Sequence, residues 1–182
     1  MIESDFQGDI KRLKNKANLN REIRAHLFRR YDRLNKAIST ITIVGSVTIA
    51  IISMALYGSS LGEIFLFYVC FLGIIISTLV VIERIWDFRK KSYEENDAMN
   101  RLTDFSWECD MMLRKDINEE DLHTIKDKYV ALTNALPGSG ISDVLFLKIK
   151  KSFLVKVELS KRLDSDPSLN VKREYKKLMK NK

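Results

Sequence analysis

Side chains that carry catalytic or metal chemistry are scarce in this sequence and poorly spaced for it. The two histidines, His26 and His123, belong to different predicted helices and show no metal-ligand spacing. The acidic run at 116–121 lacks the central glycine and the final glutamate of a calcium loop, and it is typical of a helix start. The glycine-rich segment at 137–140 is followed by no Walker lysine. We therefore predict that the protein is not an enzyme and uses no cofactor and no metal.

The charged residues are gathered at the two ends of the chain. Its 182 residues include 31 Lys and Arg and 24 Asp and Glu, a formal net charge of +7. Residues 37–82 nevertheless contain a single charged side chain, Glu63. Mean hydropathy over the whole chain resembles that of a soluble protein and conceals this apolar middle. The two cysteines are too few for a disulfide framework or a four-cysteine zinc site.

Two uncharged runs in this apolar middle are long enough to cross a bilayer. They cover residues 37–57 and 64–82. A hydrocarbon core about 30 Å thick needs about 20 helical residues, so we predict a transmembrane hairpin over 37–83 with an outer loop at 58–63. The first run begins too far along the chain for a signal peptide.

Charged side chains next to the spans predict the topology. The short loop carries no Lys or Arg, so the positive-inside rule places both termini in the cytoplasm. Glu83 and Arg84 end the second span, either as a charged ring at the inner mouth of a pore or as interfacial anchors. The flanking basic residues are candidates for lipid-headgroup or partner contact, with a solvated helix face as the alternative. They are Arg29, Arg30, Arg33, Lys36, Arg89, Lys90 and Lys91.

Outside the spans, apolar residues recur every three or four positions, which is typical of amphipathic helices. A stripe from Ile23 to Leu34 predicts a basic cytoplasmic helix within residues 1–36, starting near residue 18 and entering the first span without a break. A second stripe predicts that the helix of the second span continues to about Arg114. We expect residues 84–163 to be a cytoplasmic helical region and residues 164–182 to be a basic, flexible tail.

Two further helix starts are recognisable from capping residues. Asn118 with Asp121 fits a capping box before a helix at 119–136, and Ser142 or Asp143 fits the N-cap of a helix at 144–163. No segment has the alternation of a convincing strand. The predicted fold class is all-α: a two-helix transmembrane hairpin whose helices extend into a small cytoplasmic helical bundle.

Small and polar residues recur along the spans at helical spacing. A candidate pore-lining stripe on the first span consists of Ser39, Thr42, Ser46, Ile49 and Ser53. These hydroxyls either line a water path in an oligomer or return their hydrogen bonds to their own helix and serve packing. Small residues that permit close approach of helices are the packing candidates. They are Gly45, Ala50, Cys70, Gly73 and Ser77.

Charge is also segregated after the second span. Residues 92–147 hold 5 basic and 12 acidic side chains, whereas residues 148–182 hold 12 basic and 4 acidic ones. Stretches of opposite charge can pair within or between subunits as a clasp. The basic stretch can alternatively attract nucleic acid, although the aromatic residues that stack single strands are not interleaved with it.

Three stretches resemble the SLATT family, two-transmembrane effectors of bacterial conflict systems. They are RRYDRLNKAISTITIVGS at 29–46, AMNRLTDFSWECDMML at 98–113 and DLHTIKDKYVALTNALPGSG at 121–140. The resemblance covers roughly residues 20–155 and lies in layout rather than in a sharp signature. It implies a bacterial inner-membrane protein that forms oligomeric pores and depolarises the membrane in abortive infection.

The resemblance also implies a trigger acting on the cytoplasmic helices. The expected partners are membrane lipid, further copies of the chain, and a cytoplasmic sensor protein or a nucleic-acid or nucleotide-linked signal. The basic stretch at 148–162 is a candidate contact for such a trigger. Two alternatives stay open: a membrane anchor for a soluble partner without a pore, and an immunity-type membrane protein.

Overall fold

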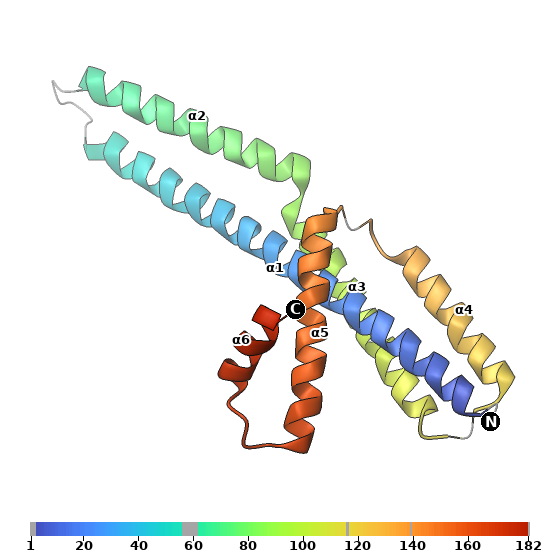
Figure 1. Cartoon of the computed structure of the whole chain (residues 1–182). Helices are drawn as coiled ribbons and strands as arrows, with labels where there is room; N and C mark the ends of the chain where they lie inside the picture. Colours follow the sequence, from blue (N-terminus) through green and yellow to red (C-terminus); the bar gives the residue numbers. More distant parts are fainter. Residues whose placement is uncertain (1–2, 56–61, 116, 139, 182) are drawn as a thin grey trace. The chain divides into compact units, whose positions relative to one another are not determined.

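The computed structural model describes residues 3–55, 62–115, 117–138 and 140–181, and in these residues every regular element is a helix (Figure 1). The all-α fold class is therefore confirmed. The helices are α1 (Glu3–Ala55), α2 (Gly62–Trp86), α3 (Phe88–Met112), α4 (Glu119–Ala135), α5 (Asp143–Ser165) and α6 (Val171–Asn181). The predicted outer loop falls outside the described residues, apart from Gly62 at the start of α2.

The chain divides into two compact units. We call residues 27–94 the hairpin unit, and we call residues 3–26 with 95–181 the helical unit. The α1 and α3 helices each contribute to both units. The hairpin unit contains the apolar part of α1 and all of α2, which run side by side in Figure 1.

The helical unit has a hydrophobic core built by α1, α3 and α4. Ile10, Leu102, Cys109 and Ile125 are fully buried in this cluster. Burial and the neighbouring carboxylates Asp110 and Glu108 raise the pKa of the Cys109 thiol to about 11. Cys109 forms no disulfide. Because its thiol is buried and its pKa is raised, we interpret Cys109 as a packing residue rather than a reactive one.

A buried ion pair accompanies this core. The Arg24 guanidinium on α1 donates from Nη1 to both carboxylate oxygens of Glu95 on α3, at 3.2 and 3.1 Å. The two side chains are only 8% and 5% exposed. Most other ion pairs, such as Arg101 with Asp97, lie on the surface, where water screens them.

The C-terminal residues do not form the flexible tail that we predicted. They form α6, whose Tyr175, Leu178 and Met179 pack on Val155 and Leu159 of α5. The prediction failed because these apolar residues mark a single side of a short, strongly basic helix. The basic residues dominate the composition, but the apolar side is sufficient for packing against α5.

Two predicted helix boundaries also need correction. The first helix begins at Glu3 rather than near residue 18, because Phe6, Ile10 and Leu13 extend its apolar stripe into the core. The helix of the second span does not continue to Arg114, because Asp87 separates α2 from α3. Asp87 has a φ of 41°, in the left-handed region that ends helices.

The predicted helix caps are confirmed. The Asn118 side chain accepts a hydrogen bond from the Asp121 amide, and the Asp121 carboxylate accepts one from the Asn118 amide. Ser142 caps α5 by accepting from the Leu145 amide at 3.4 Å. Local hydrogen bonding thus determines where these two helices begin.

We predict that Arg24→Met destabilises the helical unit by about 3 kcal/mol, because it leaves the Glu95 carboxylate buried without this partner. Arg101→Met is the matched control, since the same substitution there breaks an exposed pair with Asp97 at a cost of about 0.5 kcal/mol or less. Hydrogen exchange of the full chain in detergent, read over residues 3–26 and 95–112, measures both. Equal loss of protection in the two variants would contradict the prediction.

Candidate membrane-spanning hairpin

The hairpin unit exposes an extensive apolar surface. Both of its long helices contain an 18-residue window long and apolar enough to cross a membrane, and none of either window is buried inside the structure. Ile43, Phe67 and Ile74 are 64, 71 and 65% exposed. A core helix of a soluble protein would bury such side chains against its neighbours. The hairpin therefore has the surface expected of a segment solvated by lipid.

A narrow seam holds the two apolar helices together. On α1 the residues with reduced exposure follow a spacing of four and three through Ile38, Thr42, Gly45, Ile49 and Ile52. On α2 they include Val69, Gly73, Ile76 and Leu79. This alternation of three and four is the pattern of helices that pack side by side at a small angle.

Gly45 is the point of closest approach in this seam. A Cβ atom at this position would lie 2.5 Å from Cδ1 and 3.1 Å from Cγ1 of Ile76. At Gly73 a Cβ would meet nothing within 4 Å. The hairpin thus requires glycine at position 45, and it leaves free space at position 73.

The predicted hydroxyl stripe does not lie on a single surface. Thr42 is half-buried in the seam together with Ile49. Ser39 is also half-buried, whereas Ser46 and Ser53 are exposed beside the seam. The stripe therefore follows the edge of the seam. Thr42 and Ile49 lie in the contact with α2, and Ser46 and Ser53 lie on the outer surface of the hairpin.

The hydroxyls of this stripe differ from other hydroxyls of the same helices. Thr48 and Thr78 donate to the carbonyl oxygens of Val44 and Ile74, four residues earlier, each at 2.8 Å. Such bonds satisfy a hydroxyl inside its own helix. Within the described residues, the hydroxyls of Ser46 and Ser53 make no hydrogen bond. These two groups are therefore available to water or to another chain.

The remaining packing candidates face outward. Ala50, Cys70 and Ser77 are exposed, so they do not form the contact between α1 and α2. Of the predicted packing set, the structure brings Gly45 and Gly73 into the seam. Any packing by the other three must involve a further copy of the chain or lipid.

Three aromatic side chains mark the base of the hairpin unit, and our sequence analysis did not group them. Phe88 lies between Tyr31 and Trp86, with ring centroids 6.4 and 5.8 Å away. Asp87 joins α2 to α3 here: its amide donates to the Glu83 carbonyl, and its carboxylate accepts from the Lys90 amide. The signals in the sequence that could have found this group are Tyr31 and the run Trp86-Asp87-Phe88, in which an aspartate lies between two aromatic residues.

A polar group is buried in the same unit. The Oδ1 atom of Asn35 is buried and has no hydrogen-bond partner among the described residues. Asn35 precedes Ile38 by three residues and so continues the seam spacing of α1. This side chain breaks the apolar character of the seam two residues before the uncharged run begins.

The charged residues that flank the spans are mostly exposed. Glu83 is half-buried and Arg84 is exposed at the end of α2. Arg30, Arg33, Lys36, Lys90 and Lys91 are all exposed, as are Arg29 and Arg89. Lys36 pairs with Asp32 at 2.8 Å, and Arg89 lies over the Tyr93 ring at 5.9 Å. Long basic side chains so placed can reach phosphate groups at a membrane surface.

The described part of the chain contains no group of His, Cys, Asp and Glu that could hold a metal ion. The fold and the hairpin thus define the class of protein at a coarse level: an all-α chain with two helices able to cross a membrane. No protein-family model matches the sequence, and no curated protein or solved structure is significantly similar to it.

We predict that Gly45→Ala destabilises the hairpin by about 1–2 kcal/mol, because the added methyl group overlaps the Ile76 side chain. Ile76→Val removes the Cδ1 atom and should restore most of this loss in the double variant. Gly73→Ala is the control and should leave stability unchanged. Thermal unfolding in one detergent compares the stability of the wild type, Gly45→Ala, the double variant and Gly73→Ala. A Gly45→Ala chain as stable as Gly73→Ala would show that the close approach is not required.

Proposed function

We propose that the protein is an oligomeric membrane effector that opens a water path through the bilayer. Exposed hydroxyls on a helix that otherwise presents hydrocarbon carry this proposal. Ser46 and Ser53 have no partner in the described chain, whereas Thr48 and Thr78 are satisfied by their own backbone. A hydroxyl in lipid without a hydrogen bond costs free energy, so a surface that faces water or another polar helix is favoured.

A hairpin alone cannot enclose such a path. Two helices have one seam, and that seam is occupied by Ile38, Ile49 and Ile76. Several copies arranged with Ser46 and Ser53 facing inward would enclose the hydroxyls and leave Val44 and Ile51, on the opposite side of α1, toward lipid. Homo-oligomerisation therefore follows from the pore proposal.

The biological setting of the proposal comes from the layout shared with the SLATT family. In that setting the protein resides in a bacterial inner membrane with both termini in the cytoplasm. It depolarises the membrane in anti-phage defence, which ends in abortive infection. A sensor protein or a nucleotide-linked signal acts on the helical unit and controls opening. Exposed basic residues on both sides of the apolar runs support the orientation.

The experiment is to induce the chain in bacteria and follow membrane potential with a dye, beside a chain lacking residues 37–83. We expect prompt depolarisation by the full chain. We expect Ser46→Leu with Ser53→Leu to reduce the signal to that of the deleted chain, because leucine closes the polar path. Thr48→Leu is the control, since Thr48 is exposed and satisfied by Val44.

Both leucine variants must reach the membrane in equal amounts and keep the same oligomer size. Depolarisation that survives the double serine substitution would reject the water path along this stripe. A wild-type chain that inserts fully and leaves the potential unchanged would reject unaided opening, and it would leave two classes of protein: an effector that opens only with its trigger, and an anchor that holds a soluble partner at the membrane.

A further inference from the structure

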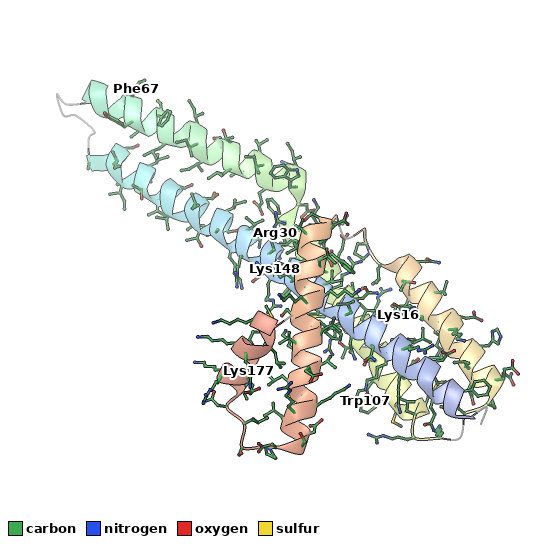
Figure 2. All side chains as sticks on the ribbon, in the orientation of Figure 1. Lys16, Arg30, Phe67, Trp107, Lys148 and Lys177 are labelled. Carbon is green, nitrogen blue, oxygen red and sulfur yellow. The ribbon has the colours of Figure 1, made fainter. Side chains whose placement is uncertain are left out.

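The helical unit carries an apolar groove on the outside of α3. The groove has a volume of about 430 Å³ and is lined by Asp104, Trp107, Glu108, Met111, Met112 and Lys128. Trp107 is 69% exposed and Met111 is 44% exposed. Figure 2 labels Trp107 on the helical unit. A tryptophan left this open beside a methionine is a strong anchor for a partner helix. The groove carries two carboxylates and one ammonium group, and Lys128 pairs with Glu108 at 3.1 Å. Asp104 has no ion-pair partner in the described chain, so it leaves the groove with an unpaired negative charge.

A second exposed apolar surface lies on α5 and has the opposite charge. Val144, Leu147 and Leu154 are 78, 60 and 45% exposed. At about 100° per residue they fall within about 80° of one another on one side of the helix. We call this surface the α5 ridge. Lys148 and Lys150 flank it, and Lys151 lies within it between Leu147 and Leu154. The structure gives these three lysines no ion pair within the described residues.

The two surfaces do not satisfy each other inside one chain. Both are exposed within the same unit. The ion pairs of the acidic stretch at 92–147 lead to its own residues, to Lys90 at the start of α3 or to α1, as in Lys128 with Glu108, Lys90 with Glu94 and Lys14 with Asp110. Those of the basic stretch at 148–182 are Arg162 with Glu158 and Glu174, Lys177 with Glu174, and Lys156 with Glu22. Among the described residues, no ion pair joins the two stretches.

We propose that the α5 ridge of one copy docks into the Trp107 groove of the next copy. The apolar side chains of the ridge would fill the groove, and its lysines would face Asp104 and Glu108. This is a helix-in-groove contact with complementary charge at the rim. It rests on the proposed function in one respect, because it names the surfaces through which that oligomer is assembled.

A contact of this kind joins two different surfaces, so each copy keeps one free groove and one free ridge. Repetition of such a contact closes into a ring when the rotation permits. Insertion of the hairpins would hold the copies in one plane and raise their effective concentration, which compensates for a small interface. A ring of helical units is the geometry that would gather several hairpins around one path.

The test is cross-linking between two differently tagged full-length chains in the same cells. Both carry Cys70→Ser, and chains with no added cysteine report any cross-linking through the buried Cys109. One chain has Trp107→Cys and the other Leu147→Cys, and a short bismaleimide is added to membranes. We expect a cross-linked heterodimer. Val171→Cys replaces Leu147→Cys as the control, because Val171 is an apolar residue of similar exposure, at 50%, on α6.

Charge reversal provides a second readout with the native tryptophan in place. We expect Asp104→Lys with Glu108→Lys, or Lys148→Glu with Lys151→Glu, to weaken self-association about tenfold or more. A mixture of the two variants should regain association, because opposite charges again face each other. Circular dichroism of each variant confirms that the helices are retained.

Two cross-linking results would overturn the proposal. In the first, the Trp107→Cys chain cross-links only to other Trp107→Cys chains. In the second, the yield of the 107–147 cross-link is no higher than the yield with the Val171→Cys control. Failure of the mixed charge variants to associate would also overturn it. The membrane-potential assay separates this result from the pore: depolarisation without the 107–147 cross-link rejects the contact alone. A cross-link without depolarisation by the wild-type chain supports the contact and rejects unaided opening of the pore.

Discussion

The α1 helix is the element on which both units depend. It runs without a break from Glu3 to Ala55, with Ile10 and Ala17 in the core of the helical unit and Gly45 in the seam of the hairpin. An unbroken helix satisfies its interior backbone groups within itself, which is required of any segment placed in hydrocarbon. The same helix therefore contributes to a packed core at one end and exposes an apolar surface at the other.

The two units achieve stability by different means. The helical unit buries Leu102 and Ile125 and places the Arg24–Glu95 pair away from water, so it has the interior of a small soluble bundle. The hairpin unit buries little, because only a seam along α1 and α2 is covered. Apart from exposed hydroxyls such as those of Ser46 and Ser53, the remaining surface of its spans is apolar, and lipid would solvate that apolar surface at no cost. The close contact at Gly45 then matters more, because dispersion rather than the hydrophobic effect would hold the pair.

Both proposals concern groups that one chain leaves incomplete. Ser46 and Ser53 lack hydrogen-bond partners, and Asp104 and the lysines of the α5 ridge lack ion-pair partners within the described residues. The hydroxyls lie in the hairpin unit, and the charged surfaces lie in the helical unit. Association of several copies would satisfy both sets, and an opening step in such an assembly would be controlled where the helical units meet.

Sequence alone determined the elements that depend on composition or on a few neighbouring residues. The uncharged runs at 37–57 and 64–82 predicted two apolar helices, and Asn118 with Asp121 predicted the start of α4, because hydrophobic length and capping are local properties. Tertiary structure decided which residues meet. It assigned Gly45 rather than Gly73 to the close approach, broke the helix at Asp87, ordered α6 against α5, and buried Arg24 with Glu95. Each of these depends on which residues of different helices meet or on a backbone angle that several residue types can adopt. Helical periodicity can show that a helix has an apolar side, as in α6, but it does not show which partner that side meets.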